Sequence, residues 1–568
     1  MTSSVIKPAD IREVAVIGLG LMGSGIVELV GRSGRRVVAI EVDRGFLDQG
    51  MARLGASLDK AVSKGKLADT ARAEILARIR PTHDLAAGVA DADLVIEAIP
   101  ERMELKKALF AQLDQACRPD AILATNTSSL SITEIAGGTR YPARVAGLHF
   151  FNPAPVMKLV EVISTVLTSA DTSESLALLA HDLGKTPVRI SDRAGFIVNA
   201  LLLPYLNHAV RLLETGQAAR EDIDKAATVG LGLPMGPLTL LDLIGLDTSM
   251  AVLETLQAEF GGTRYLPAPL LRKLCDARLF GRKSERGFYD YQRHSPSAAD
   301  AEDHDLAPRA LPAAVALLRD SGGLLDELAG AITEAGIDVL PQPSPKTDLV
   351  IVTADPRHRV LDAAMAAGHP ADVVGIHLFE TLAGKQKLAE LVLPDVTAPD
   401  TAAKAAALAA RLRLNAVTVR DRPGFLAAAL AYAQFNDAVR MFQDGYASPA
   451  DIDVAMMLGC GYPRGPFQML DDAGPAYVVG VLEAMHASTG DPAFTPVPLL
   501  AEYATAGTRF RGLPMKCQNT VLNRTRWPTS ERGVSDGLRA DRRARPDPQH
   551  GTGVRRSRAG ADSGRDRP

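Results

Sequence analysis

Short apolar runs alternate with longer amphipathic stretches along the first 190 residues of the chain. The runs at 13–17, 37–40, 93–98, 121–124 and 145–148 have the length and the β-branched content of buried strands. The stretches between them carry apolar residues at helical spacing, so we expect a helix after each strand. This alternation predicts an α/β fold with a parallel, doubly wound sheet.

Beyond residue 190 the pattern becomes purely helical. An apolar stripe at helical spacing covers 195–213, a second helix is expected to begin at Glu221 and Asp222, and Pro237 suits the first turn of a third. We therefore expect an all-α domain after the sheet.

The chain contains an internal repeat at a constant offset of 229 positions. The motif at 192–196 returns at 421–425, and the motif at 233–237 returns at 462–466. Residues 145–163 return less perfectly as 373–392, with one additional residue inserted. A whole unit is therefore duplicated, and the second copy is the degenerate one.

These patterns divide the chain into six segments. We expect an α/β domain at 10–190, a helical domain at 191–291, a polar linker at 292–308, a truncated α/β copy at 309–419, a second helical domain at 420–510 and an arginine-rich tail at 511–568. The tail lacks apolar periodicity, which predicts disorder. A basic arm for nucleic acid is the less favoured interpretation, because the change is abrupt and interrupts the second copy. A shifted reading frame in the gene would explain both the abrupt change in composition and the interruption of the second copy. Resequencing the gene tests this hypothesis.

Composition and charge narrow the classes of protein. The 568 residues are 46% hydrophobic and 23% charged, as in ordinary globular proteins, and the net charge is -4. This balance argues against a protein that binds nucleic acid or a membrane surface. The chain has no apolar run of membrane-spanning length and no signal-peptide pattern at its start, so we expect the cytoplasm. The four cysteines form no CxxC pair, and we expect neither a metal site nor a disulfide framework.

A glycine motif, Gly18-Leu19-Gly20-Leu21-Met22-Gly23, separates the first strand from the first helix. Its glycines permit a tight turn, a close approach of the backbone to a pyrophosphate, and close packing of helix on strand. The second strand ends in Glu41, whose carboxylate suits the adenosine ribose hydroxyls and repels a 2'-phosphate. Together they favour a Rossmann-type domain that binds NAD, although Arg44 weakens the preference over NADP. Taken alone, the glycines would fit a tight turn without a ligand.

Three further motifs resemble those of a known family. They are Thr-Asn-Thr-Ser-Ser-Leu at 125–130, His-Phe-Phe-Asn-Pro at 149–153 with Lys158 and Glu161 after it, and Gly-Phe-Ile-Val-Asn at 195–199. With the glycine motif, they make residues 10–510 resemble the L-3-hydroxyacyl-CoA dehydrogenases. The two-unit layout resembles the long bacterial forms, including the phenylacetate-degradation type.

The resemblance implies roles for individual residues. His149 falls at the position of the general base, Glu161 at that of its carboxylate partner, and Ser128 and Asn199 at those of residues that hydrogen-bond around the substrate. Contacts with the nicotinamide end of the cofactor are implied for Glu101, Lys106 and Asn152.

Alcohol oxidation explains why such residue types are needed. A base must take the hydroxyl proton while hydride leaves carbon, and imidazole, with a pKa of about 6.5, suits this exchange. His149 follows a strand on the side of the sheet where ligands bind, and Glu161 can accept from its other ring nitrogen. Each residue also has a structural alternative. Taken alone, a histidine after a strand is more often structural than catalytic. Ser128 would fit a cap for a helix beginning near Ser131, and Asn199 would fit an ordinary polar position on a helix face.

The favoured function is the oxidation of (3S)-3-hydroxyacyl-CoA to 3-oxoacyl-CoA with NAD, in fatty-acid β-oxidation or aromatic catabolism. A β-hydroxyacid dehydrogenase acting on free acids shares the glycine loop but relies on a catalytic lysine. A non-catalytic protein that only binds NAD or serves structurally is the third interpretation. Lys64 and Lys66 are weak candidates for binding coenzyme A phosphates, and complementing a helix dipole is the favoured role for both.

The second copy keeps His377 and Glu390 but changes their surroundings. Neither the glycine motif nor the motif at 125–130 has a counterpart in it. Two positions differ directly: Asn199 is matched by Ala428, and Asn152 by Glu380. We therefore expect no second active site. We expect instead that the two helical domains pack within one chain, as an intrachain pseudo-dimer, with association of whole chains left open.

Overall fold

The computed structural model describes residues 5–292, 311–318, 324–380 and 387–511. The expected linker and the arginine-rich tail, with the frameshift hypothesis, fall almost wholly outside these residues. Among the described residues, no helix has both the length and the apolar character needed to cross a bilayer.

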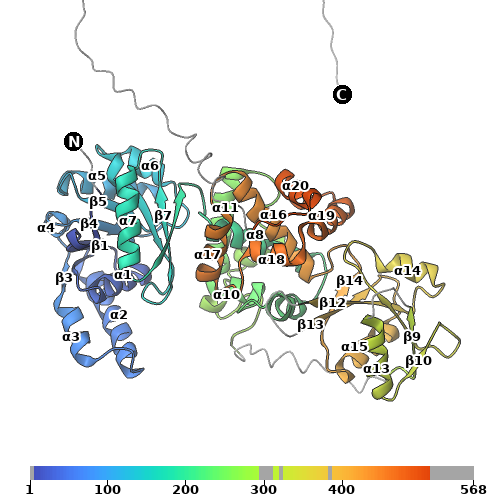
Figure 1. Ribbon diagram of the computed structural model, residues 1–568. Helices are drawn as coiled ribbons and strands as arrows, with labels where there is room; N and C mark the ends of the chain where they lie inside the picture. Colours follow the sequence, from blue (N-terminus) through green and yellow to red (C-terminus); the bar gives the residue numbers. More distant parts are fainter. Residues whose placement is uncertain (1–4, 293–310, 319–323, 381–386, 512–568) are drawn as a thin grey trace, which may run out of the picture. The chain divides into compact units, whose positions relative to one another are not determined.

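The first sheet is mixed and has helices on both faces (Figure 1). Its strand order is β3-β2-β1-β4-β5-β6-β7-β8. The strands are β1 (Glu13–Ile17), β2 (Arg36–Ile40), β3 (Ile79–Thr82), β4 (Leu94–Glu97), β5 (Ile122–Thr125), β6 (Val145–Phe150), β7 (Leu159–Ser164) and β8 (Thr186–Ser191). The helices are α1 (Leu21–Arg32), α2 (Arg44–Ser63), α3 (Asp69–Ala77), α4 (Leu85–Val89), α5 (Met103–Ala116), α6 (Ile132–Gly137) and α7 (Ala170–Asp182).

Two apolar cores, one on each face, confirm the doubly wound arrangement. One core packs α1 and α7 on the sheet through residues such as Ile26 and Leu176. The other packs α4, α5 and α6 through residues such as Phe110 and Ile135. One pair of strands departs from the expected parallel sheet, because β7 runs antiparallel to β6. The short connection 151–158 between them cannot make the long crossover that a parallel pair requires.

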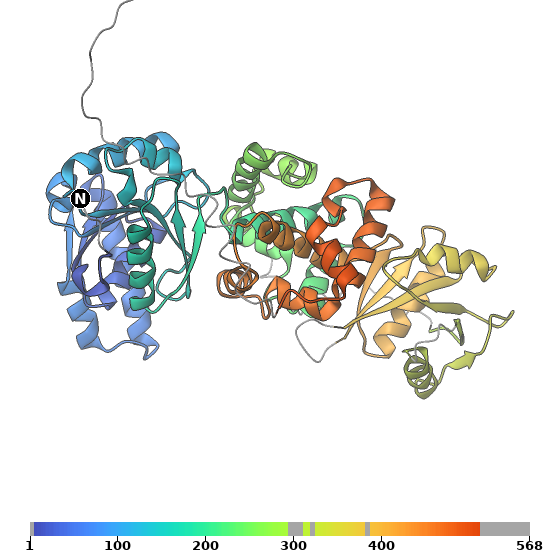
Figure 2. The same ribbon diagram turned by 45° about the horizontal axis from the view of Figure 1, so that its top comes forward.

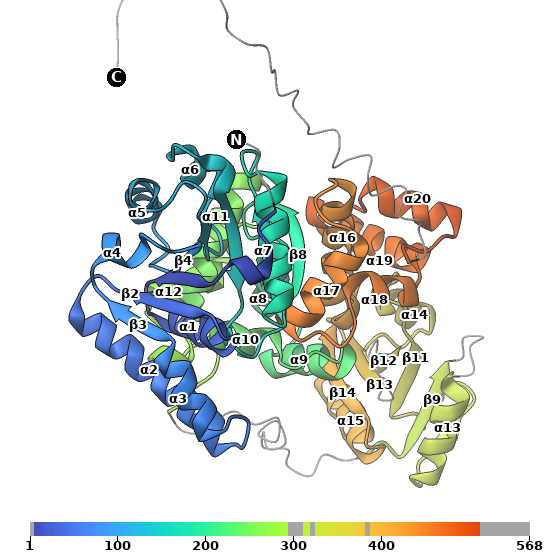
Figure 3. The same ribbon diagram turned by 60° about the vertical axis from the view of Figure 1, so that its left-hand side comes forward.

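Helices α2 and α3 pack on each other and form an arm that extends from the sheet (Figures 1 and 3). Asp43 caps α2 by accepting from the amide of Phe46, and Gly50 lets the helix approach Leu19 closely. Lys64 is the C-cap residue of α2 and, like Lys66, is exposed.

The helical region after β8 confirms the expected helices and contains their repeats. The first copy comprises α8 (Val198–Glu214), α9 (Arg220–Lys225), a π-helical turn (Ala226–Gly230), α10 (Pro237–Ile244), α11 (Leu246–Phe260) and α12 (Pro269–Asp276). The second comprises α16 (Ala427–Gln443), α17 (Pro449–Cys460), α18 (Pro466–Ala473), α19 (Pro475–Thr489) and α20 (Pro498–Ala506). Both copies share one apolar core, and α8 packs directly on α16 (Figure 2).

The second sheet is a shortened version of the first. Its strand order is β10-β9-β11-β12-β13-β14. The strands are β9 (Ala314–Leu318), β10 (Asp338–Leu340), β11 (Leu349–Thr353), β12 (Val373–Glu380), β13 (Lys387–Leu393) and β14 (Asn415–Arg420), with helices α13 (Leu324–Glu334), α14 (Val360–Ala366) and α15 (Pro399–Arg411). The strands β11 to β14 repeat β5 to β8, including the antiparallel pair.

One expectation about the second copy needs correction. The segment 354–359 follows β11 and leads into α14, as 126–131 follows β5 and leads into α6. Asp421 accepts from the amides of Val360 and Leu361 at the start of α14, and Asp192 accepts in the same way from Thr133 in α6. The loop therefore has a structural counterpart whose residues have changed, which a search for the motif letters does not detect.

Candidate active site

The glycine motif forms the turn between β1 and α1. Gly18 has a φ of +88°, and a Cβ placed there would lie 2.7 Å from the carbonyl oxygen of Ala98. A Cβ on Gly23 would lie 1.7 Å from the carbonyl oxygen of Gly18. Gly20 is the N-cap of α1, and a Cβ placed there would have no atom within 4 Å. Glycine is thus required where backbone meets backbone, and the helix N-terminus faces open space, as a pyrophosphate site needs.

Glu41 lies at the end of β2 beside this loop. Its carboxylate accepts from the amide of Leu19 at 2.6 Å and from that of Val42 at 3.0 Å. Arg44 forms an ion pair with Asp48 at 3.0 Å. The negative charge is therefore held against the glycine loop, where it suits ribose hydroxyls and opposes a 2'-phosphate.

His149 and Glu161 lie directly opposite each other on β6 and β7. The Nδ1 atom of His149 lies 2.7 Å from Oε2 of Glu161, whose side chain is fully buried. Because a carboxylate only accepts, Nδ1 carries the proton in the neutral ring and Nε2 has a free lone pair. The second oxygen of Glu161 accepts from the amides of Ile197 and Val198, at 3.0 and 3.3 Å. This pair, called here the first dyad, is thus tied to the start of α8.

Two phenylalanine rings flank the imidazole of the first dyad. The ring of Phe151 lies 4.6 Å from that of His149, and the ring of Phe196 lies 5.4 Å away. Phe196 has a φ of 50°, a left-handed conformation that is uncommon for residues other than glycine. The aromatic walls restrict the imidazole to one orientation.

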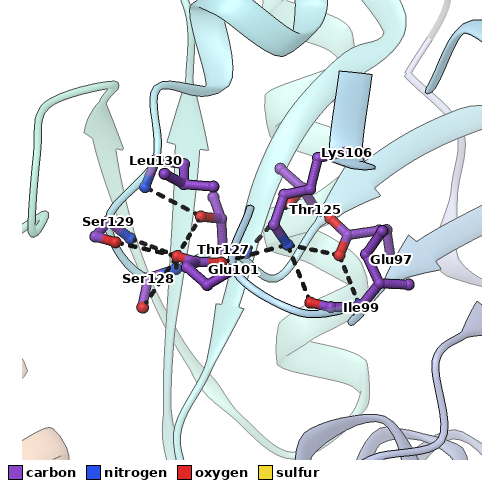
Figure 4. A network of polar contacts seen from close by, with 9 residues as sticks. All are labelled: Glu97, Ile99, Glu101, Lys106, Thr125, Thr127, Ser128, Ser129 and Leu130. Carbon is purple, nitrogen blue, oxygen red and sulfur yellow. Dashed lines mark hydrogen bonds and ion pairs between the residues drawn. The ribbon is translucent and has the colours of Figure 1, made fainter. Parts of the chain in front are cut away.

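Glu101 joins the loop after β5 to the loop after β4 (Figure 4). One of its oxygens accepts from the amides of Ser128 and Ser129, at 2.8 and 3.0 Å, and from the hydroxyl of Thr127 at 2.6 Å. Burial raises the pKa of Glu101, but the charge of Lys106 and these hydrogen bonds outweigh it, so the net pKa is lowered. Glu101 is therefore held as a carboxylate that orders the 127–129 loop.

Lys106 is buried beneath this loop. Its ammonium lies 2.6 Å from Glu97 and 3.4 Å from Glu101, and Glu97 also accepts from the hydroxyl of Thr125 at 2.6 Å (Figure 4). The side chains of Lys106 and Glu97 are 1% and 0% exposed. Lys106 therefore supports Glu101 from within the fold.

Two residues of this site, Glu97 and Asn126, were not predicted as functional from the sequence. Glu97 is an acid at the end of an apolar strand, and that contrast was the available signal. Asn126 accepts from the amide of Phe150 at 2.8 Å and so ties the 125–130 motif to β6. Phe150, the partner of Asn126, lies on another strand, so no local spacing in the sequence indicated this contact.

The remaining predicted residues differ in how close they come to the first dyad. The side-chain nitrogen of Asn199 (Nδ2) donates to the backbone carbonyl oxygen of Ser128 at 3.5 Å, so these two residues are in contact. The alternative role of Ser128, as the cap of α6, is wrong: Ser131 itself is the N-cap and accepts from the backbone amide of Glu134. Asn152 is exposed in the connection after β6. Lys64 and Lys66 lie on the α2–α3 arm, which packs on α1 and β3.

The second copy contains a second dyad built in the same way. His377 Nδ1 lies 2.6 Å from Oε2 of Glu390, on strands paired in the same register. The other oxygen of Glu390 accepts from the amides of Leu426 and Ala427, at 3.0 and 2.9 Å. Its surroundings differ, since Ala428 follows where the first copy has Asn199. Likewise, Pro356 stands where the first copy has Ser128.

Comparison with known proteins agrees with this geometry. Residues 13–193 match the family model described as the 3-hydroxyacyl-CoA dehydrogenase NAD-binding domain. The model of the C-terminal domain of that family matches twice, at 195–291 and 424–511. These matches cover both sheet and helices of the first copy and the helices of the second.

Individual relatives cover one or both copies. The chain is 36% identical over 502 residues to 3-hydroxyadipyl-CoA dehydrogenase of Escherichia coli, covering 87% of this chain and 98% of that protein. It is 47% identical to 3-hydroxybutyryl-CoA dehydrogenase of Clostridioides difficile, covering 50% of this chain and 100% of that protein. A crystal structure of 3-hydroxybutyryl-CoA dehydrogenase from Escherichia coli matches with a TM-score of 0.73 at 34% identity, covering 88% of this chain and 99% of that one. The chain therefore belongs to the 3-hydroxyacyl-CoA dehydrogenase family, with the NAD-binding domain of that family followed by two copies of its C-terminal domain.

Proposed function

We propose that this protein oxidises (3S)-3-hydroxyacyl-CoA to 3-oxoacyl-CoA with NAD, reversibly. The observation that carries the proposal is the first dyad, which is buried, anchored to α8 and built on the same sheet as the dinucleotide loop. The names of the relatives, 3-hydroxyadipyl-CoA and 3-hydroxybutyryl-CoA dehydrogenase, support a thioester substrate. An enzyme for free hydroxy acids is not favoured by these relatives.

In this proposal His149 is the general base. Bound NAD would supply the acceptor for the hydride. Nε2 of His149 takes the proton of the substrate hydroxyl, while Glu161 holds the proton on Nδ1 and stabilises the imidazolium that forms. Because Glu161 also accepts two backbone amides, it cannot turn away from the ring without leaving buried donors unpaired.

Ser128 and Asn199 are the proposed hydrogen-bonding residues for the substrate. Their proximity lets both reach one carbonyl oxygen, where donors favour the charge that develops during the reaction. Glu101 keeps the Ser128 loop in place, and Asn152 is proposed near the nicotinamide on the resemblance alone. Lys64 and Lys66 remain weak candidates for the coenzyme A phosphates.

The NAD site is proposed to follow the glycine loop. Amides at Gly20, Leu21 and Met22, at the start of α1, would hold the pyrophosphate, and Glu41 would bind the adenosine ribose. The residues present fit this group, because a Cβ on Gly20, the N-cap of α1, would have no atom within 4 Å, and Glu41 lies beside the same loop.

The reaction is tested by following NADH with a series of substrates. 3-Hydroxybutyryl-CoA and 3-hydroxyadipyl-CoA should each be compared with free 3-hydroxybutyrate, and acetoacetyl-CoA reduction gives the reverse reaction. Turnover of the thioesters but not of the free acid is expected. Turnover of the free acid alone, or of neither class, would overturn the proposal. Preference within the series would assign fatty-acid or aromatic catabolism, and a cytoplasmic location stays a prediction.

We also infer that the two helical domains form an intrachain pseudo-dimer. Three ion pairs join them, Arg193 with Asp444 at 3.4 Å, Arg211 with Asp491 at 3.7 Å, and Arg264 with Asp437. In every pair the arginine belongs to the first copy and the aspartate to the second. At the aspartate positions the first copy has Thr215, Gly262 and His208. Two first copies paired through this face would therefore leave their arginines without acids, which favours pairing with the second copy.

A charge reversal tests this inference in the full chain. Arg264→Asp and Asp437→Arg should each lower the unfolding free energy, and the double variant should recover about 1 to 3 kcal/mol of the loss. Additive losses would contradict the pairing. Sedimentation of the wild-type chain then determines whether whole chains associate further.

A further inference from the structure

Helix α17 of the second copy packs against the elements that carry the first dyad. It contacts β7, which carries Glu161, and α8, whose first amides bond to Glu161. Burial raises the pKa of Cys460 at the end of α17 to about 12, and the nearby charge of Glu161 adds to this rise. The hydroxyl of Tyr446 donates to the carbonyl of Ser191 at 3.0 Å and anchors the segment before α17.

Gly459 is the point of closest approach. A Cβ placed on it would lie 2.9 Å from Cγ2 of Val198, 3.0 Å from Cδ2 of Leu159 and 3.5 Å from Cε1 of Phe151. Val198 is β-branched and 2% exposed, and Leu159 is 0% exposed, so neither can turn aside easily. No side chain fits here without moving the neighbours.

Two of these three neighbours contact the first dyad, and the third lies beside it on β7. The ring of Phe151 packs on the imidazole of His149. Leu159 precedes Glu161 by two positions on β7 and so lies on the same face of the strand. The amide of Val198 donates to Glu161. A shift at Gly459 would therefore reach both the imidazole and its carboxylate.

The first copy makes the reciprocal contact. Gly230 stands 229 positions before Gly459, and a Cβ on it would lie 3.0 Å from Cδ2 of Leu388 and 3.6 Å from Cβ of Ala427. Leu388 and Ala427 are the counterparts of Leu159 and Val198 at the same offset. Gly230 therefore abuts the second dyad as Gly459 abuts the first.

We propose that Gly459 is a positioning residue for the His149–Glu161 pair, so that the second copy supports the active site of the first. This inference rests on the proposed function. The absence of a side chain lets α17 close over the β7–α8 junction, and the apolar contact keeps the dyad rigid. The second copy thus contributes to catalysis through α17, although its own dyad lacks a complete site.

The test compares matched substitutions at the two glycines. Neither has a left-handed φ, and alanine favours helix, so Gly459→Ala and Gly230→Ala add one methyl group without straining the backbone. Gly459→Ala should lower kcat by about tenfold to a hundredfold, the usual effect of misplacing a catalytic group by up to about 1 Å, with the KM for NAD unchanged. Gly230→Ala should leave kcat within about twofold of wild type, since its neighbours hold no catalytic group. The pH profile of kcat should move only in Gly459→Ala.

An independent readout separates this inference from the proposed reaction. In histidine-labelled protein, the NMR titration of His149, assigned with His149→Ala, should change in Gly459→Ala and not in Gly230→Ala. Equal effects of the two substitutions on kcat and on this titration would overturn the positioning role while leaving the reaction intact. If the wild type is inactive but the NMR titration of His149 changes in Gly459→Ala alone, the proposed reaction is wrong and the contact between Gly459 and the first dyad is supported. Thermal unfolding of both variants shows whether their losses of stability are equal.

Discussion

The two dyads differ in their neighbours and hardly at all in themselves. His149–Glu161 and His377–Glu390 share strand register, distance and the two amides that each glutamate accepts. The first stands on a sheet that carries a dinucleotide loop, and Asn199, which contacts Ser128, directly follows the residue whose amide donates to Glu161. A buried glutamate that caps a helix and fixes two strands has a structural role of its own. The pair therefore has the same geometry in both copies, and the residues around it are what differ.

The largest expected difference between the dyads is in turnover. His149→Ala should lower kcat by about 10² to 10⁴, the usual contribution of general acid–base catalysis, with NAD affinity near wild type. His377→Ala, the matched control, should turn over like wild type. Steady-state kinetics and NAD titration measure both. A large loss in His377→Ala would mean that the second dyad takes part in chemistry.

The next expected effect concerns Asn199, which the second copy replaces with Ala428. Asn199→Ala should lower kcat by about 10² if it removes one donor to the developing charge. Ala428→Asn places the same amide beside the second dyad and should give no activity in a His149→Ala background, because that copy lacks the glycine motif. Rescue by Ala428→Asn would contradict the assignment of a single site.

A smaller effect is expected from the cofactor loop. Glu41→Ala removes a charge that opposes a 2'-phosphate, so the preference for NAD over NADP, measured as the ratio of kcat/KM values, should fall at least about tenfold. Arg44 is engaged with Asp48 and should not compensate. An unchanged ratio would place the ribose contact elsewhere.

The smallest difference between the dyads is expected in stability. Glu161→Ala and Glu390→Ala each leave two buried amides without an acceptor, so each should lower the unfolding free energy by about 1 to 3 kcal/mol per unpaired group. Chemical denaturation of both variants measures this. A loss confined to Glu161→Ala would show that Glu390 has no structural role.

Several features could be predicted because local patterns carry them. The alternation of strands and helices, the glycine turn and the repeat at 229 positions are readable within short windows. The antiparallel β7 was missed, because apolar periodicity does not record strand direction. Lys106 pairs with Glu97 and Glu101 beneath the loop, and its contact with the cofactor stays a prediction.

The amino-acid sequence alone was sufficient for the fold class, the NAD-binding motif and the duplication, because glycine turns, apolar periodicity and repeated motifs are each contained in short stretches of residues. His149 and Glu161 became candidates through the resemblance of their motifs to a known family. The contacts of Glu101 with the Ser128 loop, and of α17 with the strand and helix that hold the first dyad, became visible in the folded chain alone. These contacts join residues far apart in the chain. Their geometry depends on how whole elements pack, and no local spacing encodes that packing.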